Sequence, residues 1–264
     1  RNRMYNFELL ALYNNSWGNF DFNATLGGNL YKVNNQTIVT TAKDMKIRDV
    51  VALMSFNEVS VEPYSYRKQI NSIYGAVNLG WKHMLYFDAT LRGDQSSTLP
   101  ISNNMYIYPS FSGSFVFSEL LKLGDKLPYG KVRMSWAQVG SDTDPYQLGL
   151  VYTKSKFAYP GYTIGYISNG TIPNKDLKPT KTNSFEMGLE LKFLKNRIGL
   201  DFTYYSQLSK NQIMGMASSS TSGYGYRLIN AGEIENKGVE IALNTRPIQT
   251  KDFSWDLNFN FSKN

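Results

Sequence analysis

The chain has 264 residues, of which 42% are hydrophobic and 14% aromatic, and its formal net charge is +7; this length suits one large β domain or two small ones. It contains no cysteine, which excludes a disulfide framework, a cysteine–zinc site and a thiol nucleophile. No apolar run reaches the roughly 18 residues that mark a transmembrane helix, so we expect none. The Lys and Arg residues are spread along the chain instead of clustering, so we expect no nucleic-acid partner.

Ten segments of the chain have the period of a β-strand, with an apolar side chain at every second position. Several of them run about nine to thirteen residues, which is closer to a tilted membrane strand than to an average globular strand of roughly five or six. The ninth segment is expected near 226–244. In chain order, the apolar sets include Phe20, Phe22, Ala24 and Leu26; Ile73, Gly75, Val77, Leu79 and Trp81; Leu85, Phe87, Ala89 and Leu91; Val132, Met134 and Trp136; Phe185, Met187, Leu189, Leu191 and Phe193; Ile198, Leu200, Phe202 and Tyr204; and Phe253, Trp255, Leu257, Phe259 and Phe261.

The connections between these segments alternate between short and long. In an up-and-down meander every second connection lies at the same end, so this alternation places tight turns at one end and long loops at the other, which is typical of an outer-membrane β-barrel. The sequence therefore predicts an all-β fold, an antiparallel up-and-down transmembrane barrel wall of about ten strands. The short connections are 14–19, 82–84, 119–129, 194–197 and 246–252, and the long ones are 32–68, 93–105, 141–181 and 210–226.

Two alternatives remain open on this pattern. A soluble extracellular β-sandwich that binds a ligand would point the same apolar residues inward. A complete ten-stranded outer-membrane enzyme is disfavoured because both ends of the chain look cut and because the lone histidine, His83, lies in a short connection. The opposite face of the strands carries charged residues, which we expect to line a water-filled lumen as solvated groups: Asp88, Arg92, Arg133, Glu186, Glu190, Lys192, Asp201 and Glu240.

Five stretches of the chain resemble the SusC/RagA-type TonB-dependent transporters of the Bacteroidetes outer membrane. The most specific is 230–240, Asn-Ala-Gly-Glu-Ile-Glu-Asn-Lys-Gly-Val-Glu, which is similar to the family's Asn-x-Gly-x-x-x-Asn-x-Gly-x-Glu strand. The stretch 174–179, Asn-Lys-Asp-Leu-Lys-Pro, resembles a segment that precedes a strand in the family, with Lys175 in place of the usual Pro. The other three are 108–112, 133–140 and 200–205.

The resemblance implies that residues 1–264 form part of a single barrel domain of about 22 strands, with the plug and the N-terminal extension absent from this chain. It also implies an outer-membrane location and the import of large nutrients, glycans or peptides. The expected partners are outer-membrane lipid, a SusD-like surface lipoprotein and the TonB complex, which would act through the missing plug region.

No catalytic, metal or cofactor site is expected from the sequence. His83 lacks the partners that a metal site needs, and we interpret it as a structural or solvent-exposed residue. Asp142 and Asp144 are interpreted as solvated turn residues. The candidates for substrate or partner contact are aromatic residues of the longest loop, because exposed aromatic rings stack on sugars or anchor a partner. They are Tyr146, Tyr152, Phe157, Tyr159, Tyr162 and Tyr166.

Overall fold

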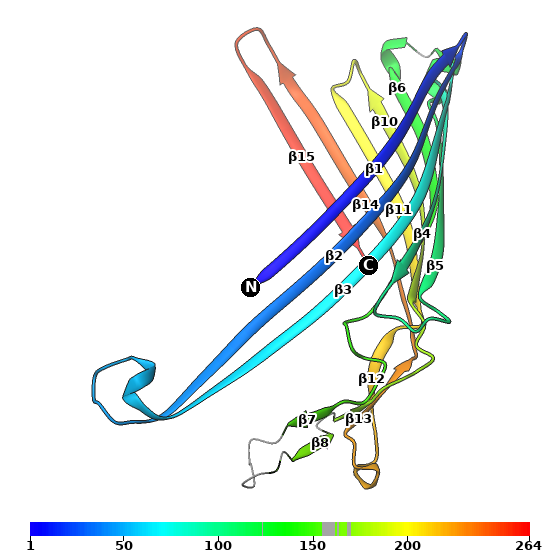
Figure 1. The fold of residues 1–264 in the computed structure, drawn as a ribbon. Helices are drawn as coiled ribbons and strands as arrows, with labels where there is room; N and C mark the ends of the chain where they lie inside the picture. The colour runs from blue at the N-terminus through cyan, green and yellow to red at the C-terminus, as the bar shows by residue number, and fades with distance from the viewer. Residues whose placement is uncertain (123, 155–161, 163, 168–169) are drawn as a thin grey trace.

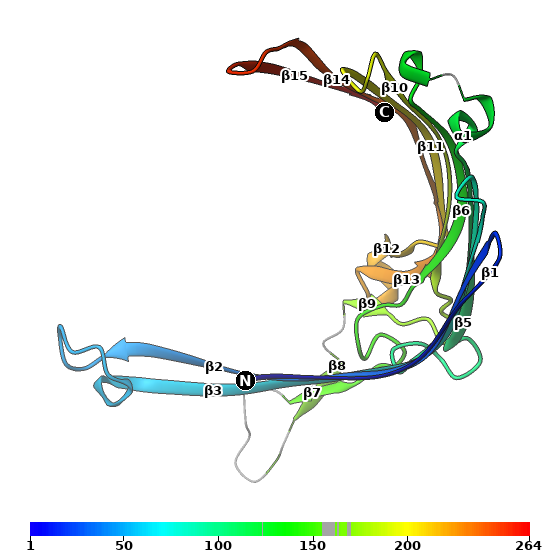
Figure 2. The same ribbon diagram turned by 90° about the horizontal axis from the view of Figure 1, so that it is seen from above.

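The computed structural model describes residues 1–122, 124–154, 162, 164–167 and 170–264. Ten of its strands form one antiparallel sheet, in the order β1-β2-β3-β4-β5-β6-β10-β11-β14-β15. Seen from above, the sheet curves into an open arc (Figure 2). We call this sheet the wall. The predicted fold class, an antiparallel up-and-down barrel wall of about ten strands, is confirmed.

Tight turns join the wall strands at one end, uppermost in Figure 1, and the longer loops lie at the other. The wall strands are β1 (Asn2–Trp17), β2 (Phe20–Met45), β3 (Phe56–Trp81), β4 (Leu85–Ser96), β5 (Met105–Phe115), β6 (Tyr129–Ser141), β10 (Thr180–Phe193), β11 (Ile198–Lys210), β14 (Glu233–Gln249) and β15 (Ser254–Lys263). The loops hold β7 (Tyr152–Lys154), β8 (Gly165–Ile167), β9 (Thr171–Ile172), β12 (Ile213–Ala217) and β13 (Tyr226–Asn230), while α1 (Phe117–Leu121) lies in a turn. None of the helices in the described part of the chain is long and apolar enough to cross a membrane.

The register of the wall separates its two faces. Residues directly opposite each other on neighbouring strands share a face, and one such row crosses nine strands with apolar side chains only. This row is Phe20, Trp81, Leu85, Phe115, Val132, Leu189, Phe202, Ile241 and Phe261. The adjacent row on the other face contains Asp21, Tyr86, Arg133 and Glu240.

The apolar face is the convex one. The loop strands β9, β12 and β13 lie inside the arc (Figure 2), and the loop residues pack on Tyr106, which shares its face with Asp94. Large apolar side chains on the opposite, convex face are therefore left open, such as Leu9 at 70% exposed and Phe259 at 57%. A soluble sandwich would bury these residues between two sheets, so that alternative is wrong.

Only four hydrophobic residues form a buried core cluster in the described chain, namely Leu99, Tyr106, Leu177 and Leu228. They lie among the loops and the loop ends of the strands, not between two layers of sheet. A wall with one lipid-facing side needs no second layer to cover its apolar face.

Two predicted boundaries are wrong. The expected long connection 32–68 is mostly strand, because β2 continues to Met45 and β3 begins at Phe56, and the two stay paired almost to their tip. The expected ninth strand, 226–244, is divided into β13 and β14, with Gly232 between them. Gly232 has a positive φ of 81°, a conformation that interrupts a strand and that glycine adopts at little cost. The first half, β13, pairs with β12 and β9 in a separate three-stranded sheet.

Candidate functional site: the concave face and its loops

Arg133 on the concave face is paired with a carboxylate across strands. Arg133 donates two hydrogen bonds to Asp201, at 3.0 and 2.8 Å, and a third to Thr203 at 2.7 Å. Gly188 lies between Arg133 and Thr203 in the register, and a Cβ there would lie 2.5 Å from Arg133 Nε. The Arg133 side chain therefore passes over Gly188 on the surface of the sheet, and its guanidinium binds the Asp201 carboxylate in bidentate geometry.

A second network lies towards the loop end of the concave face. Arg92 donates to Asp94 at 2.9 Å and to Ser72 at 3.0 Å, and the Tyr108 hydroxyl donates to the same Asp94 carboxylate. Asp88 accepts from Asn78 and Ser112. The predicted lumen charges Arg133, Asp201, Arg92 and Asp88 lie on the concave face, and each also has a protein partner. The side chains of Arg92, Arg133 and Asp201 remain 34% to 40% exposed.

Asp142 fastens the longest loop to the wall. Its carboxylate lies 2.7 Å from Lys68 Nζ and accepts hydrogen bonds from Ser96 at 2.5 Å and Thr98 at 3.1 Å. The Asp142 side chain is only 12% exposed. The prediction of a solvated turn residue is wrong for Asp142, because its partners lie 44 to 74 residues away in the sequence and no local pattern marks them.

The predicted aromatic residues do not form one platform. Tyr146 lies near the wall, where its hydroxyl accepts a hydrogen bond from the Arg67 backbone N–H at 3.1 Å. Tyr152 and Tyr166 are on the β7–β8 hairpin, which projects beyond the wall (Figure 1). Tyr152 is opposite Ile167 and Tyr166 is opposite Thr153, so the two rings lie on opposite faces of the hairpin.

The remaining residues considered in the sequence analysis do not contribute to a common site. Tyr162 is 73% exposed, while Phe157 and Tyr159 lie outside the described residues. His83 is in a tight turn with a positive φ of 54°, and its exposed side chain is 3.9 Å from Asp21. Among the described residues, no group of three or more His, Cys, Asp or Glu side chains is arranged to hold a metal ion.

A cavity of about 520 Å³ opens on the concave face where the loop after β6 meets the wall. Its floor is apolar, two tyrosines flank it, and it holds an acidic residue, Asp144, for which no ion pair is found in the described chain. Sequence reasoning missed this site because its walls come from three strands and a distant loop. The lining residues are Asn2, Met4, Tyr31, Val33, Tyr66, Lys68, Ile70, Asp144 and Pro145.

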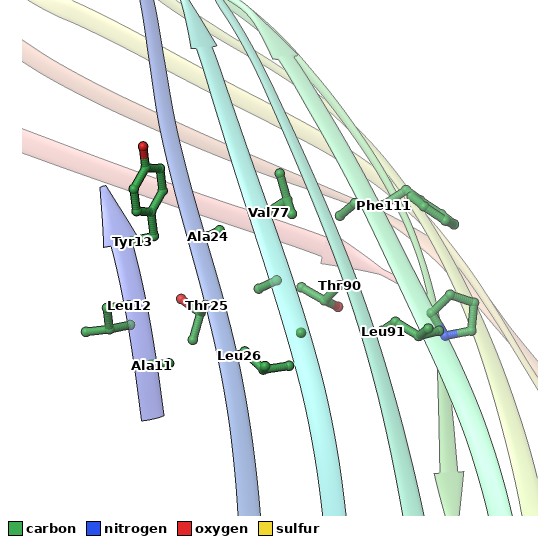
Figure 3. A pocket seen from close by; sticks show the side chains of 14 residues that line it. Ala11, Leu12, Tyr13, Ala24, Thr25, Leu26, Val77, Thr90, Leu91 and Phe111 are labelled. Atoms are coloured by element: carbon green, nitrogen blue, oxygen red, sulfur yellow. The ribbon is translucent and has the colours of Figure 1, made fainter. Parts of the chain in front are cut away.

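A larger depression, of about 590 Å³, lies on the convex face (Figure 3). It exists because the small residues Ala11, Ala24, Gly75 and Ala89 share a face with bulkier neighbours at its rim, among them Leu26 and Phe111. Since this face is the lipid-facing one, the depression does not open towards the lumen.

Two of the sequence motifs build the loop core. The Asn230 side chain accepts a hydrogen bond from Lys178 N–H at 2.7 Å, and donates to the carbonyls of Lys178 and Asn211 at 2.7 and 3.1 Å. Leu177, from the stretch 174–179, is fully buried in the core. A Cβ at Gly238 would lie 2.3 Å from the Lys263 carbonyl. The motifs thus mark loop anchors and a close approach of two strands.

Comparison with known proteins agrees with the fold. The sequence model of the family described as TonB dependent receptor-like, beta-barrel matches residues 1–263. TonB-dependent receptor P3 of Formosa agariphila is 28% identical over 97% of this chain, and TonB-dependent receptor SusC of Bacteroides thetaiotaomicron is 29% identical over 76% of it. The chain spans only 26% and 21% of the length of these two relatives.

Solved structures share the wall. The structure of the RagAB peptide transporter matches 99% of this chain and 30% of its own chain, at 22% identity and a TM-score of 0.86. The outer membrane transporter YddB of Escherichia coli matches 98% of this chain and 33% of its own, at 13% identity and a TM-score of 0.66. The resemblance expected from the motifs is confirmed.

Proposed function

Because the chain belongs to the TonB-dependent receptor-like β-barrel family and is part of an outer-membrane barrel, we propose that the full-length protein imports a large nutrient across the outer membrane. In this proposal the chain supplies part of the barrel wall and several extracellular loops. The energy would come from the TonB complex, acting through a plug region encoded elsewhere in the full-length protein.

The observation that carries the proposal is the two-sided wall with loops folded against its concave side. The convex face is apolar along the strands, and the concave face holds paired charges, tyrosines and a cavity of about 520 Å³. A polar interior suits a solvated cargo, while an apolar exterior suits lipid. Loops held by a buried core and by the Asp142 contacts would give a nutrient a surface of defined shape.

The proposed partners follow from the relatives. One relative is named SusC and one matched structure is a RagAB peptide transporter, so we propose a SusD-like surface lipoprotein as partner and a glycan or a peptide as nutrient. Two places on the chain are offered for nutrient or partner contact. One is the β7–β8 hairpin with Tyr152, Tyr162 and Tyr166, and the other is the cavity beside Tyr31 and Asp144.

The test is an uptake measurement with the full-length protein in cells that lack the native gene. Deletion of residues 153–165 should reduce uptake of the cognate labelled oligosaccharide or peptide without reducing the amount of folded barrel, because exposed loops tolerate change better than strands. A triple variant, with Tyr152, Tyr162 and Tyr166 each changed to Ser, keeps the loop length and tests the rings alone. Reduced uptake in the deletion alone would assign this hairpin to spacing, and unchanged uptake in both variants would exclude it from nutrient contact. Absence of any uptake by the wild-type protein would contradict the proposed import.

A further inference from the structure

A row of cations lies on the convex face of β1–β3, just beyond the apolar band. Arg3, Asn34 and Arg67 are directly opposite one another on the three strands, which lie side by side (Figure 1). Lys32 is two residues from Asn34 on the same face, and Arg1 is beside Gln36, whose N–H donates to the Arg1 carbonyl at 2.8 Å. We call Arg1, Arg3, Lys32 and Arg67 the outer cation row.

The depth of the outer cation row matches lipid headgroups. The apolar band of β2 ends at Leu30, and Asn34 is four residues further along the strand. At about 3.3 Å per residue and a tilt of about 45°, this places Asn34 about 9 Å above the band. The headgroup layer of a bilayer is about 5 to 8 Å thick on each side, so flexible Arg and Lys side chains around Asn34 reach into it.

The outer cation row is unpaired, unlike Lys68, Arg92 and Arg133 on the concave face. Lys68, next to Arg67 in the chain but on the other face, has Asp142 as its partner. Arg3, Lys32 and Arg67 make no ion pair with any described residue. The convex positions of β1–β3 from Tyr5 and Lys32 out to Ala42 include no Asp or Glu. This face therefore concentrates positive charge without neutralising it.

The row also surrounds a small pocket of about 170 Å³. Arg1, Arg3 and Arg67 line it, together with Asn34, Asn35, Gln36, Ser65 and Tyr66. The side-chain oxygen of Asn34, one of these lining residues, is buried, and no hydrogen-bond partner for it is found in the described chain. Arginine forks suit phosphate oxygens, whereas an unsatisfied amide oxygen needs a donor such as a hydroxyl.

We propose that the outer cation row binds the phosphorylated sugar headgroup of a glycolipid in the outer leaflet. The phosphate would lie between the Arg3 and Arg67 guanidinium groups, and a sugar hydroxyl would donate to the Asn34 side-chain oxygen. Attraction of basic side chains by an anionic leaflet is a general property of membrane proteins. The hydroxyl contact makes a phosphorylated sugar a better match than a phospholipid headgroup that lacks hydroxyl groups. The inference rests on the membrane orientation of the wall and not on nutrient import.

The experiment measures binding of fluorescent lipopolysaccharide to the purified full-length protein in detergent. The double variant Arg3→Gln, Arg67→Gln should bind about thirtyfold more weakly, the loss expected for two charges near an anionic headgroup. Asn34→Asp should also weaken binding, because it adds a negative charge between the arginines. The matched control is Arg197→Gln, Lys251→Gln, which removes two charges at the tight-turn end and should leave binding unchanged.

Four competitors identify the ligand. Intact lipopolysaccharide should compete strongly, whereas enzymatically dephosphorylated lipopolysaccharide, inorganic phosphate and phosphatidylethanolamine should compete weakly. Equal competition by the dephosphorylated form would overturn the phosphate contact. Equal competition by phosphatidylethanolamine would overturn the sugar-hydroxyl contact, and equal competition by inorganic phosphate would overturn the lipid source. Heat-modifiable migration on gels verifies that each variant is folded. The variant Arg3→Lys, Arg67→Lys, which keeps the charge but loses the fork, should bind with intermediate affinity; wild-type binding by the double Gln variant would refute the site.

Discussion

Neighbouring residues at the middle of β3 offer a direct test of which face meets lipid. Val77 lies on the convex face, opposite Ala24 and Ala89, while Ala76 lies on the concave face, opposite Thr25 and Thr90. Val77 is four residues from Trp81 and four from Ile73, which bound the apolar stretch of this strand. At about 3.3 Å per residue and a tilt of about 45°, Val77 is about 9 Å from either edge, close to the bilayer midplane.

The variant Val77→Arg should lower the free energy of unfolding by about 2–4 kcal/mol, the usual penalty for Arg on the lipid face at the midplane. Ala76→Arg places the same side chain at nearly the same depth in the wet lumen, so its penalty should be about 1 kcal/mol or less. A difference of about 2 kcal/mol corresponds to roughly thirtyfold in the folding equilibrium constant.

The assay is urea titration of the full-length protein folded into lipid vesicles, followed by tryptophan fluorescence and by heat-modifiable migration on gels. Val77→Leu, which changes volume without adding charge, serves as the packing control and should cost less than Val77→Arg. Equal penalties for Val77→Arg and Ala76→Arg, or a larger one for Ala76→Arg, would refute the assignment of the convex face to lipid.

Three further substitutions test the concave face and the loops. Asp142→Asn should loosen the longest loop and increase its cleavage by protease, because it weakens a partly buried ion pair. The control Asp144→Asn should change the cleavage rate little. Equal cleavage rates for the two variants would contradict the anchoring role of Asp142. Gly188→Ala should displace the Arg133 guanidinium, so its stability loss should not add to that of Arg133→Ala in a double variant; full additivity would refute the crossing geometry. Leu177→Ala should destabilise the loop core by about 2–5 kcal/mol, measurable as faster hydrogen exchange in the loops while exchange in the wall stays slow.

The sequence by itself determined the wall. A strand with lipid on one side and water on the other must alternate, so the period-two pattern of segments such as 198–204 and 253–261 predicted both the strands and their faces. The tight turns were also predicted from the sequence, because a chain reversal of only a few residues allows few backbone conformations. The family resemblance was also readable, since its motifs are local.

The sequence did not predict what lies beyond the membrane. Outside the lipid both faces of a pair of strands are exposed to solvent, so residues 32–45 and 56–68 do not alternate regularly between apolar and polar. Their pairing nevertheless continues almost to the tip. The same reason hid the division of 226–244 at Gly232.

Only the tertiary structure decided the contacts of the loops. Asp142 meets Lys68 across 74 residues, and Arg67 in turn approaches Tyr146, because the curvature of the wall brings the loop after β6 back towards β3. Likewise the outer cation row comes from three strands whose register sets Arg3 and Arg67 on either side of Asn34. Such pairings depend on the path of the whole wall, which the side-chain preferences of a short segment do not predict.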